Sequence, residues 1–571
     1  MTHLRYRGGG LVGLAPPVTL ALLALPVLAG LGGVLLPAFG WMPALGGTRL
    51  SLQPWRELAA WPGLGGAVRL SLVTGIAATL ISLAITLLIT AAWQGTRSFA
   101  AITRLLAPLL AVPHAAAAIG LAFLIAPSGW IARLLSPWAT GWERPPDLLT
   151  VGDPGGLALI AGLVIKEVPF LMLMTIAALG QADSARSAAI AQSMGYGRVT
   201  GWLKTVLPRV YPQIRLPVFA VLAYSMSVVD MALILGPTRP PTLAVQILDW
   251  MSRPDLDLRF TAAAGAVLQA GLVAGALGLW WAGERLAKAL GRRWVEAGGR
   301  GHGADRIARP AALMLAALSA GLVLGGLVGL VLWSVAGLWQ FPAPFPDTLS
   351  LRSWAGQRSG LGLAGFETLA IALVATLIAL TMVVACLEAE HRGSRAGPQR
   401  ALVILYLPLI VPQVAFLPGL QGFALLAGLE GGRGAVMAAH VIFVLPYVFL
   451  ALADPWRSWD ARAGTVAAAL GAGPNRILWM VRLPMLLRAV AVAAAVGFAV
   501  SVAQYLPTVL IGAGRIETLT TEAVALASGA NRRVIGVYAA AQMLLPMIVF
   551  ALALAIPALV FRNRRGLAVR Q

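Results

Sequence analysis

The chain has few charges, few lysines and almost no cysteine. Only 11% of its 571 residues are charged and 59% are hydrophobic, which excludes an ordinary soluble domain. The single cysteine, Cys386, excludes a disulfide framework. Lysine occurs only at Lys166, Lys204 and Lys288, and none of them follows a glycine. Because a Walker A loop needs Gly-Lys-Ser/Thr to hold phosphates, we expect no ATP hydrolysis of that kind, and no enzyme activity, on this chain.

Long apolar runs are what the chain has instead. A helix needs about 20 apolar residues to cross the hydrocarbon core of a bilayer, and about twelve runs of the chain reach that length. They lie at residues 12–38, 66–92, 101–126, 156–180, 213–236, 259–283, 310–338, 362–387, 401–427, 434–453, 487–512 and 535–561. These runs predict an all-α polytopic membrane protein with about twelve transmembrane helices.

The excess of basic residues is uneven along the chain. The net charge is +21. With the N-terminus placed inside, the loops assigned to the cytoplasm carry a large surplus of Lys and Arg, whereas the opposite loops are nearly balanced. This bias predicts that both termini are cytoplasmic. Orientation and contact with anionic membrane lipid explain the charge, so we expect no nucleic-acid partner.

The chain divides near its middle into two halves. Residues 284–309 form a basic, glycine-containing linker between a first domain, 1–283, and a second, 310–571, and six predicted spans lie on each side. Both halves begin and end on the same side, so they would be parallel repeats related by an axis along the membrane normal. The first half also has a longer outer segment, 127–155, whose charged groups would suit transient docking of another protein.

One polar stretch occurs in both halves with the same spacing. It contains Ala185, Arg186, Ala191, Gly195, Gly197, Leu207 and Pro208 in the first half, and Ala461, Arg462, Ala467, Gly471, Gly473, Leu483 and Pro484 in the second. Alanine favours a helix, a glycine just past a helix reverses the chain, and a proline restarts it into the next span. Each stretch therefore predicts a helix–turn–helix between the fourth and fifth spans of its half.

This pattern resembles the EAA loop of ABC-importer permeases, in which an alanine-rich helix precedes a glycine and, at a fixed distance, a proline. The resemblance covers nearly the whole chain, as two fused permease domains of the kind that serve ferric iron and thiamine uptake. The segment from Asp230 to Gly236, followed by Pro241-Thr-Leu243, is similar to the Ynj-type permeases within that group. The glutamate that names the motif is replaced by Ala189 and Thr465, and its first alanine by Ile190 and Val466.

The resemblance implies partners for the chain. The EAA loop of that family is a coupling helix that docks on a cytoplasmic ATPase. The chain would therefore work in a bacterial inner membrane with two ABC ATPase subunits and a periplasmic or lipid-anchored solute-binding protein. It would hold no cofactor itself, because ATP and Mg²⁺ would be bound by the ATPase subunits. The solute would be a small molecule or ion, and a thiamine-like cation, ferric iron or another ion all stay open.

Polar residues inside spans are costly and commonly face a water-filled route. The candidates for such a route are Lys166, Glu167, Asp230 and Gln504. A structural alternative for Lys166 and Glu167 is that they satisfy groups on neighbouring helices. His114 and His440 also fall within spans and are better explained as hydrogen-bonded packing residues.

Two other classes of function stay open. A six-plus-six secondary transporter driven by an ion gradient would use carboxylates within the membrane, and Glu167 and Asp230 are the only ones well inside a predicted span. That class does not explain the duplicated loop. A membrane scaffold without transport activity would need no water-accessible route at all.

Overall fold

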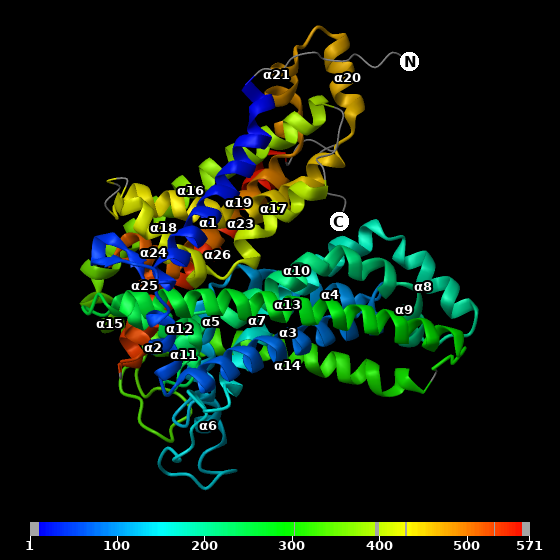
Figure 1. Ribbon diagram of the computed structural model, residues 1–571. Helices are drawn as coiled ribbons and strands as arrows, with labels where there is room; N and C mark the ends of the chain where they lie inside the picture. Colours follow the sequence, from blue (N-terminus) through cyan, green and yellow to red (C-terminus); the bar gives the residue numbers. More distant parts are fainter. Residues whose placement is uncertain are drawn as a thin grey trace.

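The computed structural model describes residues 11–301, 303–393, 399–426, 428, 431–529 and 531–561. Within these residues the chain is built almost entirely of helices (Figure 1). The one sheet among them is a short antiparallel hairpin of β1 (Trp41–Met42) and β2 (Gly47–Thr48). The all-α polytopic fold predicted from the sequence is confirmed.

Nine helices of the described residues are long and apolar enough to cross a membrane, and two bent helix pairs raise the number to as many as eleven. One of the nine combines α5 (His114–Ile125) with α6 (Trp130–Leu135). The others are α1 (Ala15–Ala38), α3 (Leu64–Trp93), α7 (Leu157–Gln181), α13 (Leu258–Glu296), α14 (Ala304–Val335), α16 (Arg358–Gly393), α19 (Arg433–Arg457) and α26 (Arg532–Val560).

The remaining predicted runs are interrupted helices. Residues 401–427 bend by 92° between α17 (Gln399–Ile410) and α18 (Gln413–Leu426). The other interrupted runs contain η3 (Ala107–Ala111) ahead of α5, α10 (Leu207–Ser227) with α11 (Asp230–Leu235), and α23 (Leu487–Val502) with α24 (Leu506–Gly512). Pro113, Pro412 and Pro507 stand at three of these breaks, and proline cannot continue a helix through its own position without losing a hydrogen bond. Hydropathy predicted continuous spans there because it does not register such breaks.

The first spanning helix of each half packs mainly on the other half. α1 lies along α18 and also contacts α17 and α16, while α14 packs against α5 and α3. Glycine permits the second of these approaches, since a Cβ added at Gly120 of α5 would lie 2.9 Å from the Gly326 carbonyl of α14. The predicted domain limits at residues 283 and 310 stay a prediction about the sequence repeat. We call α1 and α14 the exchanged helices, because each packs mainly on the opposite half. In space, they join the two halves.

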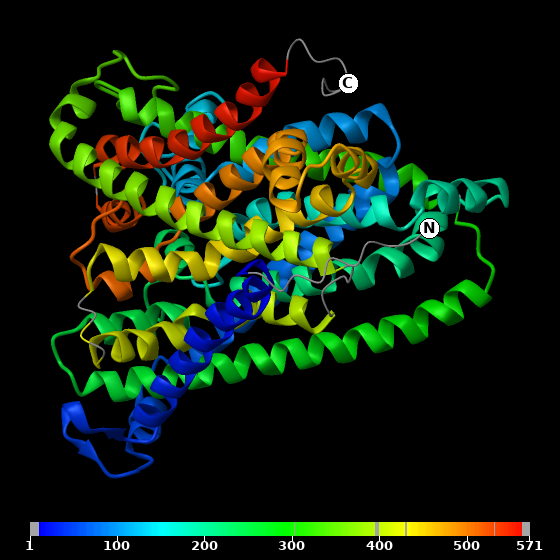
Figure 2. The same cartoon turned by 90° about the horizontal axis from the view of Figure 1, so that it is seen from above.

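The linker predicted at 284–309 is largely helical. α13 continues to Glu296, well beyond the predicted end of its span, and α14 begins at Ala304. The added length is rich in Ala, Leu, Arg and Lys, which are good helix formers. Figure 2 shows the long green helix α13 running across the molecule before the chain turns into α14.

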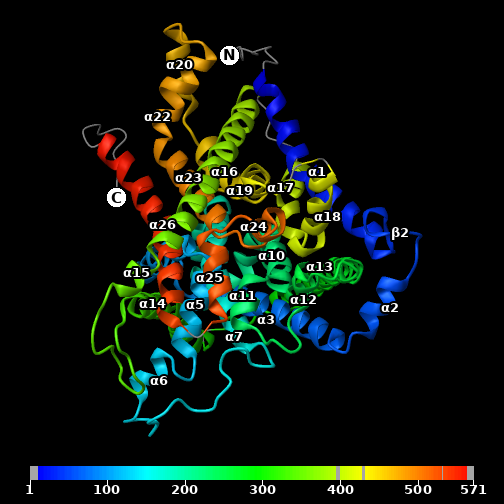
Figure 3. The ribbon, with the colours of Figure 1, turned by 90° about the vertical axis from the view of Figure 1, so that its left-hand side faces the viewer.

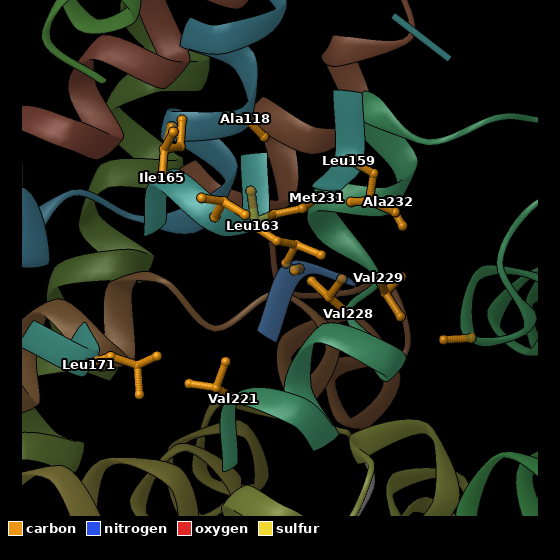
Figure 4. Close-up of a cluster of buried hydrophobic side chains, with 14 of the residues drawn as sticks. Ala118, Leu159, Leu163, Ile165, Leu171, Val221, Val228, Val229, Met231 and Ala232 are labelled. Atoms are coloured by element: carbon orange, nitrogen blue, oxygen red, sulfur yellow. The ribbon is translucent and has the colours of Figure 1, made fainter. Parts of the chain in front are cut away.

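The core of the first half positions the interrupted helix α11. Buried apolar side chains from α5, α7, α10 and α11 meet there, among them Leu163 and Met231 (Figure 4). Figure 3 shows α11, α24 and α25 (Leu519–Ala527) near the middle of the molecule. The packing of α11 on α7 and α5 therefore places residues of the first half close to elements of the second.

Candidate coupling loops and intramembrane polar cluster

The repeated stretches, here called the first loop (residues 184–208) and the second loop (461–485), have the same turn. α8 (Ser184–Ser193) leads to Gly195, and α20 (Ala461–Ala469) leads to Gly471. These glycines have φ of +80° and +83°, a left-handed conformation that favours glycine. The predicted helix and glycine turn are confirmed in both loops. Figure 1 shows the loops at the ends of two separate protrusions.

Matching hydrogen bonds close the two turns. The backbone N–H of Tyr196 donates to the Ala191 carbonyl at 3.1 Å, and that of Ala472 donates to the Ala467 carbonyl at 3.0 Å. A bond of this span is the mark of a Schellman motif, which satisfies carbonyl groups at a helix end. Ala191 and Ala467, selected from the repeat, are therefore the acceptors that end the first helix of each loop.

The chain restarts after each turn in a similar way. Gly197 and Gly473 precede α9 (Arg198–Thr205) and α21 (Pro474–Ile477). α10 begins at Leu207 and α22 (Leu483–Met485) at Leu483, each with proline in its first turn, where a missing N–H costs little. The second loop differs in having a π-helical segment, Leu478–Arg482, before that point. Ala185 and Arg186 lie on α8, and Ala461 and Arg462 on α20, so all the predicted loop residues belong to two corresponding units.

Each loop presents two large apolar side chains to solvent at matching positions. Ile190 and Met194 are 52% and 61% exposed, and Val466 and Leu470 are 62% and 83% exposed. Exposed apolar groups that recur in this way point to contact with another molecule. From the sequence alone, Ile190 and Val466 are interpreted only as departures from the family motif. An apolar side chain at the same position in both halves was the signal that could have identified this surface.

The two residues that replace the family's glutamate reach no other helix. Ala189 has no polar side chain and helps to line a cavity of about 190 Å³ between α8 and the end of α3. The Thr465 hydroxyl donates to the Ala461 carbonyl of its own helix at 3.2 Å. An ion pair at this position is therefore absent from both loops.

Different side chains tie the two loops to the spanning helices. In the first loop, Trp202 Nε1 donates to Gln94 Oε1 at 2.6 Å, and Gln94 Nε2 donates to the Ser184 hydroxyl at 2.8 Å. In the second loop, Arg482 forms an ion pair with Glu388 of α16, and both residues are 3% exposed. A neutral amide thus holds one loop, whereas a buried ion pair holds the other.

Lys166, predicted to line a route, satisfies a helix break. It lies in the middle of α7 and is 5% exposed. Its ammonium donates to the carbonyls of Leu109 and Val112 at 3.1 and 2.6 Å. These carbonyls border the break between η3 and α5, where helical partners are missing. The geometry agrees with the structural alternative for this residue.

Two of the predicted route residues, Glu167 and Asp230, lie near Tyr224. Asp230, the first residue of α11, and Glu167 of α7 are buried, and Tyr224 interacts electrostatically with both. Tyr505 follows Gln504 in the break between α23 and α24 and interacts electrostatically with Asp230. Gln504 itself is half-buried there.

Tyrosines of the second half complete this group. Tyr447 of α19 interacts electrostatically with Glu167, and its ring lies 6.4 Å from that of Phe170. We call Glu167, Asp230, Tyr224, Tyr447 and Tyr505 the polar cluster, which joins the two halves. The sequence contains only eight tyrosines, and this scarcity was the signal that could have identified the three in the cluster.

Other buried polar residues hold the breaks on either side of the cluster. Gln269 of α13 donates to the Met226 carbonyl at 2.9 Å. At the matching break, Gln542 of α26 donates to the Thr520 hydroxyl at 2.7 Å, and that hydroxyl donates to the Val502 carbonyl. His440 bonds Ser501 and Thr508 at 2.8 and 2.9 Å, so it is a packed, hydrogen-bonded histidine, as predicted.

Similarity to known proteins decides the family. Over 524 residues the chain is 34% identical to the inner membrane ABC transporter permease protein YnjC of Escherichia coli, a match that covers 91% of this chain and 93% of that protein. The chain belongs to the ABC transporter permeases. It is thus a multi-pass inner-membrane transport protein, as the sequence predicted. No protein-family model matches it.

Two shorter similarities agree with this membership. The molybdenum transport system permease protein ModB of Mycobacterium tuberculosis is 30% identical over 24% of this chain and 56% of its own length. The spermidine/putrescine transport system permease protein PotC of Haemophilus influenzae is 28% identical over 22% of this chain and 49% of its own length. In both cases about a quarter of this chain matches about half of the other permease. Each of those permeases is therefore a shorter protein than this chain.

Proposed function

We propose that the chain is the permease subunit of an ATP-driven importer and is coupled to cytoplasmic ATPase subunits through its two loops. The observation that carries the proposal is the repeated apolar pair, Ile190 with Met194 and Val466 with Leu470, exposed on two turns of the same geometry. Two like surfaces on one chain suit two copies of one partner. Neither a secondary transporter nor a scaffold needs such a repeated surface.

The proposed partners follow from family membership. Two ABC ATPase subunits would bind and hydrolyse ATP with Mg²⁺, and a periplasmic or lipid-anchored binding protein would deliver the solute. The positive-inside bias supports a cytoplasmic position for the termini and for both loops. Closure of the ATPase dimer would draw the loops together and switch the halves between two states, each favoured by a different ligand. The exchanged helices α1 and α14 would keep the halves joined during this change.

We assign the solute route to the polar cluster between the halves. Glu167 and Asp230 supply carboxylates, and the three tyrosines supply hydroxyls and aromatic faces in otherwise apolar packing. Carboxylates and aromatic faces favour a positively charged solute. Lys166 would support this route by fixing the break beside α5, and Gln504 would border it from the second half.

The test uses the chain purified in detergent together with the ABC ATPase expressed with it. Aspartate at Ile190 and Met194, or at Val466 and Leu470, should abolish ATPase copurification because it places charge in an apolar contact. The control is aspartate at Leu50 and Leu52, which are 71% and 56% exposed near the β-hairpin. Normal copurification of both loop variants, or solute uptake driven by an ion gradient without ATP, would overturn the proposal.

A further inference from the structure

The segment that joins α13 to α14 is bound to the first loop. The backbone N–H of Gly197 donates to the Arg300 carbonyl at 2.8 Å. The Asp305 carboxylate accepts from the backbone N–H groups of Arg198 and Val199 at 2.6 and 2.9 Å. Asp305 therefore caps the N-terminus of α9 from outside the loop, where negative charge is favoured. Burial and the nearby Arg309 lower the pKa of Arg198, and Asp305 opposes that shift.

A second set of contacts fixes the other side of this segment. The Lys204 ammonium donates to the Gly299 carbonyl at 2.9 Å and lies 4.7 Å from the ring centre of Trp294. Lys204 is only 8% exposed as a result. A side chain at Gly301 would collide with the Thr200 side chain, and a Cβ added at Gly197 would lie 2.9 Å from the Gly301 carbonyl oxygen, so the two segments approach closely. We call residues 294–301 and 303–309 the clamp; His302 lies outside the described residues.

The clamp places a positive charge at the tip of the first loop. A Cβ added at Gly195 would lie 3.5 Å from Arg300 Nη1, and Arg300 is itself exposed. At the matching Gly471, a Cβ would meet no atom of the described residues within 4 Å. Within the part of the chain that the structure describes, the first loop therefore has a guanidinium beside its turn, and the second loop has none there.

The faces behind the two tips differ as well. In the second loop, Trp479 and Met480 are 68% and 66% exposed. Their counterparts in the repeat are Leu203 and Lys204, and the clamp covers Lys204. The second loop therefore has an exposed apolar face at these positions. At the same positions of the first loop, the clamp covers a polar side chain.

We propose that the clamp forms one wall of the first ATPase docking site, where Arg300 meets an acidic side chain of the ATPase subunit. The inference rests on the proposed function and adds to it that the two docking sites are unequal. A charge at the edge of an apolar contact contributes orientation and association rate more than affinity. One ATPase subunit would touch both the first loop and the clamp, and the other would touch the second loop only.

Cross-linking from single cysteines in the purified permease–ATPase complex tests this inference. Cys386 is buried and the chain has no other cysteine, so Cys386→Ser gives the background for Ile190→Cys, Val466→Cys and Arg300→Cys. A short thiol-to-amine cross-linker should join the ATPase at all three positions. The control is Arg292→Cys, an exposed basic position on α13 outside the clamp, which should give no product.

The outcomes separate the inference from the proposed function. Products at positions 190 and 466 without one at 300 would leave the coupling loops in place and overturn the clamp as a docking wall. No product at any loop position would overturn both. As a second readout, Arg300→Glu should weaken ATPase binding roughly fivefold, the effect of losing and opposing one exposed charge pair. Arg300→Lys should restore binding, and Arg292→Glu should leave it unchanged.

Discussion

The first and second loops share a turn and an exposed apolar pair, but they differ in the contacts that hold them on the spanning helices. The glycine conformation, the closing hydrogen bond and the exposed apolar pair recur in both. The first loop is tied down by Gln94 and covered by the clamp, whereas the second is tied down by the ion pair of Glu388 and Arg482. The features that a partner would contact have been kept. The anchoring contacts differ between the loops. Either a hydrogen-bonded amide or a buried ion pair can hold a loop in place and keep its apolar pair exposed.

The anchor of the second loop should be the most sensitive to change. Glu388→Gln leaves Arg482 buried without its anionic partner, which costs about 3–5 kcal/mol when one member of a buried pair is removed. We expect faster amide hydrogen exchange in residues 461–485 and unchanged exchange in 184–208. Replacing both members, by Glu388→Gln with Arg482→Gln, should recover part of the protection. Equal exchange in parent and Glu388→Gln protein would show that the pair does not hold the loop.

The anchor of the first loop should be weaker. Gln94→Ala removes the acceptor of Trp202 and the donor to Ser184, and a lost hydrogen bond that strands a buried group costs about 1–3 kcal/mol. Hydrogen exchange should rise in residues 184–208 and stay constant in 461–485, the reverse of the pattern expected for Glu388→Gln. A rise in both loops would mean that the anchors are not independent.

The turns themselves should respond alike. Valine at Gly195 or Gly471 forces a side chain into a left-handed conformation, at a cost of about 1–2 kcal/mol. Each variant should lower ATPase copurification to a similar extent, and the double variant more, with membrane insertion intact. Gly180→Val, at a helical site where a Cβ meets no atom within 4 Å, is the control. Normal uptake in the double variant would contradict the role of these turns.

Release of the clamp should have the smallest effect. Asp305→Ala removes the cap of α9, and loss of a helix cap costs about 1 kcal/mol. We expect a modest increase in hydrogen exchange at residues 197–205 and a weaker association of ATPase with the first loop only. Asp347→Ala, in the segment between α14 and α16, is the matched control for loss of one carboxylate. An equal effect of Asp305→Ala on both loops would show that the clamp does not act on the first loop alone.

The repeat made the loops predictable. Gly195 and Gly471 indicated their turns because few other residues adopt that conformation, and the alanine runs indicated α8 and α20. The clamp gave no such signal, since Asp305 and Gly299 are far in sequence from their partners Arg198 and Lys204, and they meet only because α13 runs beyond its span.

Other features could not be predicted from hydropathy. The breaks at Pro113 and Pro507 lie within apolar runs, so continuous spans were expected at positions where the helices are interrupted. Tyr224, Tyr447 and Tyr505 counted as apolar positions, and the partners of Lys166 are backbone carbonyls, which leave no mark in a sequence. What could be predicted was periodic or repeated; what could not depends on contacts between distant segments.

In the proposed mechanism, the ATPase subunits move the two loops toward each other. This movement is tested most directly by the distance between spin labels at Ile190→Cys and Val466→Cys, in the Cys386→Ser background, within the permease–ATPase complex. Pulsed electron paramagnetic resonance would record that distance without nucleotide and with ATP trapped by a hydrolysis-deficient ATPase. We expect a clear shortening of this distance when ATP is bound. An unchanged distance in a complex whose ATPase subunits have bound ATP would contradict it.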